Sequence, residues 1–290
     1  MFKGRREYRQ VVNMPQMAMG GLSESWLMKE IGDCHWQMLC ADLGLKSNEI
    51  FDEFGNRLYA TFIRIKFESH NSLKDYQEND ILKIMGETQR LGNSLYFGKI
   101  DVLCNKKRIN CSLATTFSTR ENDTDNTKLT KGVPAASDND EIIKVSDLPE
   151  HILDIIRLRK ASITTVNVSD HTFELTDNVV FTEKYEINPY TDINGVGLLY
   201  FAAYPLINDI CELTYFNKNE LVGANWALNS STMSRDIFYF ANCNINEAIC
   251  YRLNSLTRIG SDHMALQSSL YRESDNTLMA KIFTIKQFRN

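Results

Sequence analysis

Residues 188–216 read NPYTDINGVGLLYFAAYPLINDICELTYF, which places a proline turn, a glycine-containing turn and a long apolar segment in that order. Residues 14–40, MPQMAMGGLSESWLMKEIGDCHWQMLC, repeat the same order. The earlier stretch has apolar residues at helical spacing, and we expect one mostly buried helix in each stretch, opened by its glycine turn. Pro15 and Pro189, which mark the two stretches, stand 174 residues apart.

After each expected helix the chain carries four runs in which apolar and polar residues alternate, a pattern typical of strands. Arg90-Leu91-Gly92 in the first set and Arg258-Ile259-Gly260 in the second stand at matching places, 168 residues apart. An ordered recurrence at one spacing predicts an internal duplication. The expected strands are 57–67, 80–91, 94–104 and 108–117 in the first half, and 235–243, 247–259, 263–272 and 277–288 in the second.

A helix followed by a four-stranded antiparallel sheet can bury the apolar face of that sheet only if the helix lies across it. This arrangement is the hot-dog fold. Two copies predict an α+β double hot-dog, whose sheets join edge to edge and cover otherwise exposed strands. We expect an N-terminal hot-dog domain at 1–120, a polar linker with a short helix at 121–160, and a C-terminal hot-dog domain at 161–290. The run 118–140 has almost no large apolar residues and predicts a flexible connection, followed by an amphipathic helix at 148–160.

The composition argues against several classes of function. The 290 residues carry a net charge of -5 and are 43% hydrophobic, which is typical of a globular chain of two domains and unsuited to nucleic acid. No apolar run reaches the length of a membrane span, and the basic first ten residues lead into no hydrophobic export segment. The seven cysteines form no CxxC pair and the five histidines no HxxxH or HExxH pair, so we expect no metal site and a reducing, cytoplasmic location.

Polar and glycine residues stand where each helix is expected to begin. Such residues commonly cap helices. Alternatively, the free amide groups of a helix start stabilise an enolate or polarise a thioester carbonyl. The residues concerned are Gly20, Gly21 and Leu22 in the first half and Asp192, Asn194 and Gly195 in the second.

Titratable residues give weaker signals. Tyr59 stands at the start of the first expected strand, where most tyrosines serve packing. Asp33, Cys34 and His35 are consecutive, but adjacent residues on a helix point in different directions. Cys34 and His35 are therefore a poor nucleophile–base pair.

Residues 187–209, above all the run Asp-x-Asn-Gly-Val-Gly-Leu-Leu-Tyr-Phe-Ala, resemble the bifunctional acyltransferase/decarboxylase family of polyketide biosynthesis, as in the leinamycin pathway. The pieces GGLSESWLMKEIGDCHW (20–36) and GNRLYATF (55–62) resemble the first helix and first strand of that family. The resemblance implies a double hot-dog enzyme that takes methylmalonyl-coenzyme A, transfers its acyl group to an acyl carrier protein and decarboxylates it to a propionyl group. Tyr59 matches the tyrosine that is the proposed acylated residue of the family.

Decarboxylation leaves an enolate, so such a site must stabilise charge at the thioester oxygen. Backbone amides at a helix start would do this, Ser23 or Thr61 could orient the substrate, and Tyr59 would act either as nucleophile or as hydrogen-bond donor. No cofactor is implied beyond the coenzyme A thioester itself and the phosphopantetheine arm of the carrier protein. An acidic carrier protein would need a local basic patch, although such charges are more often solvated surface. The candidate docking residues are Arg5, Arg6, Arg157, Arg159 and Lys160.

Two other classes of function fit the same fold. A hot-dog thioesterase or 3-hydroxyacyl dehydratase acting on carrier-bound acyl chains would need a carboxylate or a histidine to activate water, with Asp192, Asp33 and His35 as candidates. A protein that binds acyl chains without turning them over is the other class. A homodimer is compatible with each of these functions.

Overall fold

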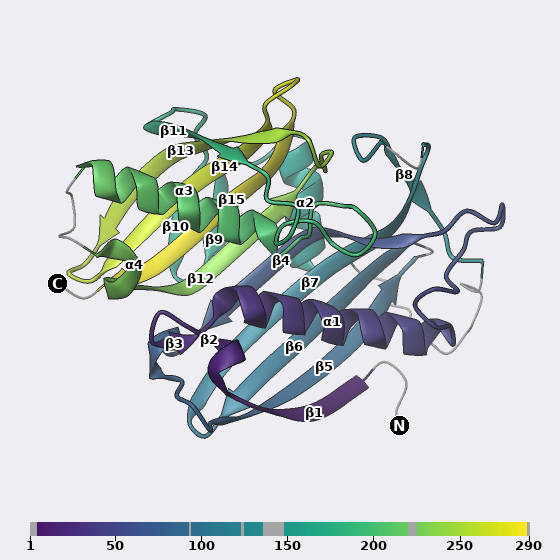
Figure 1. Cartoon of the computed structure of the whole chain (residues 1–290), viewed down its shortest axis with the longest axis horizontal. Coiled ribbons are helices and arrows are strands. Elements are labelled where there is room, and N and C mark those ends of the chain that lie inside the picture. The colour runs from purple at the N-terminus through teal and green to yellow at the C-terminus, as the bar shows by residue number, and fades with distance from the viewer. Residues whose placement is uncertain (1–4, 93, 123–124, 136–147, 220–224, 289–290) are drawn as a thin grey trace.

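The computed structural model describes residues 5–92, 94–122, 125–135, 148–219 and 225–288 (Figure 1). Within them, one antiparallel sheet of eleven strands runs through the whole molecule. Its order is β1-β5-β6-β7-β4-β12-β15-β14-β13-β11, and β8 pairs with the last residues of β7. No helix in these ranges is long and apolar enough to span a bilayer.

The two halves of the sheet come from the two halves of the chain. The first contributes β1 (Arg5–Val11), β4 (Tyr59–Ser69), β5 (Ile81–Leu91), β6 (Leu95–Cys104), β7 (Lys107–Arg120) and β8 (Leu129–Gly132). The second contributes β11 (Phe181–Glu186), β12 (Ser230–Tyr239), β13 (Ala248–Ile259), β14 (His263–Arg272) and β15 (Leu278–Phe288). The halves join through β4 and β12, whose antiparallel pairing places Ile65 opposite Ile237.

One long helix lies across the same face of each half, α1 (Glu24–Leu43) over the first and α3 (Ala203–Asn219) over the second (Figure 1). Ser23 caps α1 by accepting a hydrogen bond from the amide of Trp26 (N–O distance 3.2 Å), and Gly44 ends it at a positive φ of 68°. The apolar sides of both helices are buried against the sheet, as Ile31 and Ile207 illustrate. The predicted α+β double hot-dog is therefore confirmed.

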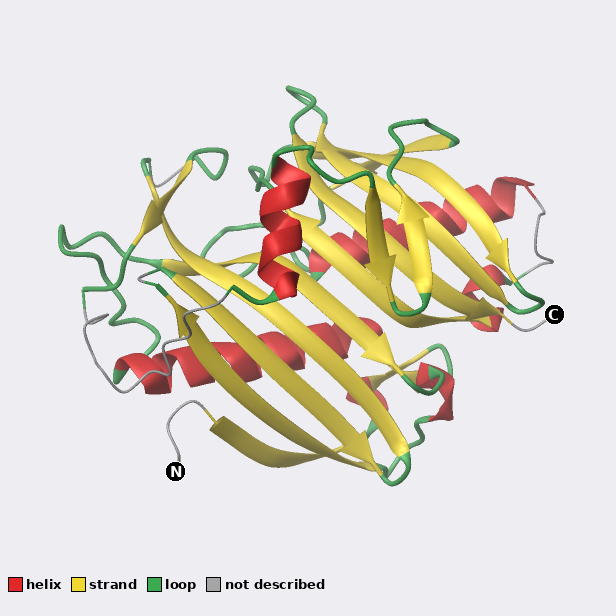
Figure 2. Cartoon of the chain, turned by 180° about the vertical axis from the view of Figure 1, so that it is seen from behind, coloured by secondary structure: helices red, strands yellow, loops and turns green. Residues whose placement is uncertain are grey.

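The opposite face of the sheet is covered by α2 (Glu150–Arg159) and by a hairpin of β9 (Thr165–Val168) and β10 (His171–Glu174) (Figure 2). A second apolar core forms there. Its buried members include Ile152, Ile155, Val166, Val168, Phe173, Phe238 and Phe283.

The expected start of the second helix is wrong. Residues 192–199 form a loop closed by a bridge between Ile193 and Leu199, and α3 begins only at Ala203. The reason is that the Asn194 side-chain oxygen accepts hydrogen bonds from the amides of Val196 and Leu198 (both 3.0 Å), which fixes a tight turn in place of a helix cap.

The first glycine turn also has a structure of its own. Gly21–Leu22 forms β3, which pairs with β2 (Met17–Ala18) in a small hairpin before α1. A short 3-10 helix, Met14–Gln16, precedes this hairpin. Two further short elements are the 3-10 helix Leu73–Asp75 and the helix α4 (Trp226–Asn229).

The expected flexible connection at 118–140 is wrong over much of its length. β7 extends to Arg120, and β8 pairs with it antiparallel, so this polar stretch continues the sheet. Asn126, only 7% exposed, donates hydrogen bonds to the carbonyl oxygens of Gly197 (2.6 Å) and Cys243 (3.1 Å), which ties the stretch to the second half. Residues 123–124 and 136–140 of the connection lie outside the described residues.

Candidate functional site

A cavity of about 520 Å³ lies where the two halves of the molecule meet. The first half supplies the middle of α1, the start of β4 and the stretch around β8. The second half supplies the 194–201 loop, the start of α3 and the residues that end β12. Both duplicated units thus build one hollow.

Seven of the residues singled out in the sequence border this cavity: Asp33, His35, Tyr59, Thr61, Arg159, Asn194 and Gly195. Gly20, Gly21, Leu22, Ser23 and Asp192 do not. Gly21 has a packing role, because a Cβ there would lie 2.5 Å from the carbonyl oxygen of Leu73. Ser23 is the α1 cap described above.

Asp192 holds the loop next to the cavity. Its carboxylate accepts hydrogen bonds from the hydroxyl of Tyr185 (2.9 Å), the amide of Asn188 (2.8 Å) and the hydroxyl of Thr191 (2.9 Å). With the side chain fully buried, these contacts leave it no role as a base for a substrate in the cavity.

Tyr59 begins β4 and lies between two guanidinium groups. The Arg57 and Arg120 Cζ atoms are 5.7 and 5.2 Å from the centre of its ring, which is cation–π range. Arg120 also donates to the Asn126 side chain (2.8 Å) and to the carbonyl of Val196. Arg120 therefore links Tyr59 to the loop from the second half.

Thr61 has an unsatisfied polar atom at the cavity. Its hydroxyl oxygen is buried and has no hydrogen-bond partner among the described residues. Leaving a buried hydroxyl unpaired costs about 1–3 kcal/mol, so such an atom is suited to a bound ligand or water.

Asn194, Gly195 and Val196 of the 192–199 loop border the cavity. A Cβ built at Gly195 meets nothing within 4 Å, and the Gly195 amide has no acceptor within the described part of the chain. The loop is held by the Asn194 turn and by Asn242, whose side chain bonds both the amide (3.0 Å) and the carbonyl (3.1 Å) of Leu199. The open amide is therefore supported by a rigid turn.

Aromatic rings form the apolar wall. Phe201 from the second half packs against Phe62 of β4, with 4.1 Å between ring centres and the rings tilted by 36°, and its ring edge occupies the space over Gly32 of α1. Trp36, Tyr200 and Tyr239 add to the same lining. Such a surface suits a hydrocarbon chain.

The acid/base residues of α1 have different environments. His35 is fully buried, its Nε2 lies 3.0 Å from the Thr115 hydroxyl, and burial lowers its pKa to about 3, so the ring is neutral at pH 7. Asp33 is exposed, borders the cavity and accepts a hydrogen bond from Gln37. It is the one carboxylate among the described lining residues.

Sequence reasoning missed several lining residues. Asn126 lies in a stretch expected to be a flexible linker, and Asn242 has no motif around it. The cations Arg57 and Lys131 also border the cavity. Arg159, for which the sequence suggests only a place in a docking patch, borders it too. In the described ranges no group of three or more His, Cys, Asp or Glu side chains is placed to hold a metal ion.

Comparisons with known proteins relate this architecture to thioesterases. The chain is similar to a protein assigned as an oleoyl thioesterase from Lactobacillus plantarum, with a TM-score of 0.67, 10% identity, and coverage of 98% of this chain and 95% of that one. An acyl-ACP thioesterase from Bacteroides thetaiotaomicron gives 0.61, 11%, and coverage of 98% of both chains. The 12:0-ACP thioesterase from Umbellularia californica gives 0.63, 11%, and coverage of 98% and 94%.

The likeness is one of fold. No protein-family model matches the chain, and no curated protein matches its sequence. The solved structures are named as thioesterases, while the finer resemblance to acyltransferase/decarboxylases stays a prediction.

Proposed function

We propose that this chain is an enzyme that acts on acyl thioesters in the cavity between its halves, and that it hydrolyses them. The observation that carries the proposal is the cavity itself, which combines an aromatic wall, an unpaired Thr61 hydroxyl, an open Gly195 amide and the carboxylate of Asp33. The fold shared with three thioesterases supports it. The substrate would be a coenzyme A or acyl carrier protein thioester.

The cavity contains the groups that hydrolysis requires. The acyl chain would lie along Phe62 and Phe201, with its thioester carbonyl near the Thr61 hydroxyl and the Gly195 amide. These donors would stabilise the oxyanion that forms when water adds, and one such donor is worth about 10²–10³ in kcat. Asp33 would accept the proton of the attacking water, a general-base role worth about 10²–10⁴. As the tetrahedral intermediate collapses, the C–S bond would break, the thiolate of coenzyme A or of the carrier arm would leave with that proton, and the free acid would be released.

A second candidate reaction is decarboxylating acyl transfer from a methylmalonyl-type thioester to a carrier protein. The position of Tyr59 favours it, because the ring lies at the cavity between two guanidinium groups. Enolate formation needs donors at the thioester oxygen and no base to activate water. In that reaction Tyr59 replaces Asp33 as the decisive residue.

The test compares two variants on two classes of substrate. Wild type, Asp33→Asn and Tyr59→Phe are incubated with saturated acyl-coenzyme A thioesters or with methylmalonyl-coenzyme A, in the presence of a phosphopantetheinylated carrier protein. Mass spectrometry then follows free acid, carbon dioxide loss and carrier adducts. Glu30→Gln, on the same helix but bonded to Tyr8 (2.7 Å), and Tyr190→Phe, 95% exposed, are the matched controls.

Hydrolysis predicts free acid from saturated thioesters, lowered about 10²–10⁴-fold by Asp33→Asn and unchanged in both controls. A propionyl carrier adduct that is lost in Tyr59→Phe and kept in Asp33→Asn would contradict hydrolysis and establish the second candidate. Intact substrate throughout would reject both reactions.

A further inference from the structure

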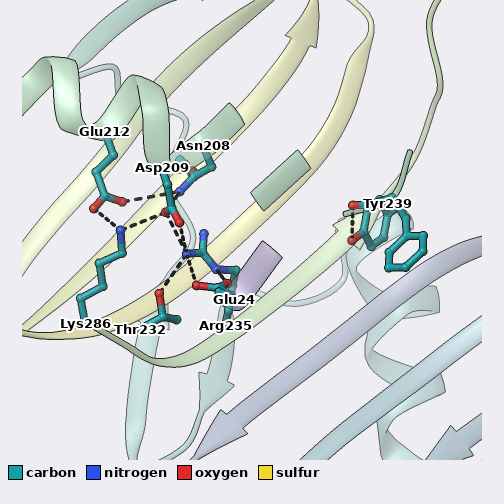
Figure 3. A network of polar contacts seen from close by, with 10 residues as sticks. Glu24, Asn208, Asp209, Glu212, Thr232, Arg235, Tyr239 and Lys286 are labelled. Carbon is teal, nitrogen blue, oxygen red and sulfur yellow. Dashed lines mark hydrogen bonds and ion pairs between the residues drawn. The ribbon is translucent and has the colours of Figure 1, made fainter. Parts of the chain in front are cut away.

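A cluster of charged side chains also lies where the halves meet (Figure 3), and none of its members lines the cavity. Arg235, Glu212 and Lys286 are buried, and the Asp209 side chain is 32% exposed. Arg235 of β12 is fully buried and forms ion pairs with Glu24 of α1 (Nε–Oε1 2.7 Å) and Asp209 of α3 (Nη2–Oδ1 2.8 Å). Lys286 of β15 bonds the same Asp209 (2.9 Å) and Glu212 (2.6 Å). The cluster thus joins both central helices to the sheet.

The strand register shows where this cluster stands in the duplication. β4 carries a bulge between Phe62 and Arg64, with Phe62 paired to Thr115 of β7. β12 carries a bulge between Thr232 and Ser234, with Thr232 paired to Lys286 of β15. By these matching bulges Phe62 corresponds to Thr232 and Thr115 corresponds to Lys286.

The helices give the same correspondence. His35 of α1 reaches Thr115 (3.0 Å), just as Glu212 of α3 reaches Lys286 (2.6 Å). One helical turn earlier stand Gly32 and Asp209, on the same sides of their helices. Gly32, His35 and Phe62 border the cavity, so their counterparts Asp209, Glu212 and Thr232 mark the equivalent place in the second half.

At both of these places a side chain from the opposite half of the molecule reaches in. In the first half, the ring of Phe201 from the second half lies over Gly32 and packs against Phe62. In the second half, Glu24 from the first half shares the ion-pair partner of Asp209, because Arg235 contacts both carboxylates. Arg235 also donates to the Thr232 hydroxyl (3.1 Å). An apolar contact borders the open site, and a chain of ion pairs occupies its counterpart.

We propose that the cluster of Glu24, Asp209, Glu212, Arg235 and Lys286 occupies and closes the second, quasi-equivalent acyl site, so that the chain binds one acyl thioester and binds it in the cavity. This inference rests on the proposed function. An acyl chain entering the cluster would have to separate buried ion pairs and leave uncompensated charges, which is strongly unfavourable. The aromatic ring beside the cluster is tied into it, because the Trp226 Nε1 donates a hydrogen bond to Glu212 (2.9 Å).

The experiment counts sites on the full chain. Isothermal titration is performed with S-alkyl coenzyme A thioethers of graded chain length, which cannot be hydrolysed. The expected result is one site per chain. Two sites per chain would overturn the inference while leaving the proposed function intact, and no binding by any thioether would reject the proposed function together with this inference.

Two variants locate the single site. Gly195→Trp adds a ring at the border of the cavity, where a Cβ meets nothing within 4 Å, and we expect it to weaken binding at least 100-fold. Lys286→Met alters the closed site, and we expect a Kd within threefold of wild type. Unchanged binding in folded Gly195→Trp would overturn the inference. Because Lys286→Met could fail to fold, the wild-type count and Gly195→Trp decide the matter without it.

Discussion

Thr61 and Tyr59 lie two residues apart in β4, and both residues border the cavity. Residues separated by two on a strand share a face. The pair therefore places two hydroxyl-bearing side chains on one face of β4. Of the two, Thr61 is the one whose buried oxygen has no partner in the described ranges.

Thr61→Val keeps the shape of the side chain and removes its hydroxyl. If that hydroxyl donates to the oxyanion, we expect kcat to fall about 10²–10³-fold with little change in KM. Thermal stability should hold or rise slightly, because an unsatisfied buried group is removed. Steady-state kinetics and thermal melts check both. The exposed Thr182→Val of β11 is the control, and a lower melting temperature with unchanged kcat would show that the hydroxyl is structural.

Among the elements, α2 is held to the sheet by charges and by a buried imidazole. Arg64 of β4 bonds Asp236 (Nε–Oδ1 2.9 Å), Asp154 (Nη1–Oδ2 3.1 Å) and the carbonyl of His151 (2.7 Å). Burial, with Arg64 and Lys66 nearby, lowers the pKa of His151 from 6.5 to about 2. The docked helix therefore requires the neutral ring.

The attachment of α2 should weaken in acid. When α2 is detached, His151 binds a proton below about pH 6.5, but when α2 is docked it binds one only near pH 2. The free energy that favours docking of α2 is therefore fully present above pH 6.5 and is lost as the pH falls below it. The docking free energy of α2 falls by up to about 1.4 kcal/mol for each pH unit. Hydrogen exchange of residues 150–159 between pH 7 and 5 measures it, after correction for intrinsic rates. His151→Gln should flatten this dependence, exposed His70→Gln should not, and equal slopes in all three proteins would refute the account.

Some elements could be predicted from the sequence because their signals are local. The alternation of β5, β6, β13 and β14 and the recurrence of their order are visible in the chain itself. The edge strands β1 and β11 lack such a signal, because RREYRQV and FTEKYE are short and mostly charged or polar, with too few apolar residues to show an alternation. The 192–199 loop was mistaken for a helix start because its anchors, Asn242 and Asn126, are distant in sequence.

The candidate site was predictable only in part for the same reason. Tyr59, Thr61, Asn194 and Gly195 stand in recognisable stretches and meet at the cavity. The contact of Phe201 with Gly32 joins residues from different halves, and no local pattern contains it. Asp192 has the residue type of a base, but its carboxylate accepts three hydrogen bonds that hold its own loop.

For the whole molecule, the duplication creates two equivalent sites between helix and sheet, and the two sites differ in structure. At one, the halves leave a hollow of about 520 Å³ with aromatic rings and open donors. At the other, three carboxylates and two cations meet with Arg235 fully buried. Breaking such buried pairs typically costs about 3–5 kcal/mol, so this second place serves as a joint between the halves.

The most direct test of the account is to locate a bound acyl thioester by photolabelling. A coenzyme A thioester with a diazirine in its acyl chain is irradiated with the full-length protein, and labelled peptides are identified by mass spectrometry with and without excess unlabelled thioester. The account predicts competed labels within residues 57–63 and 194–204, which line the cavity. Competed labels around Asp209, Arg235 and Lys286, or on the outer surface alone, would contradict it.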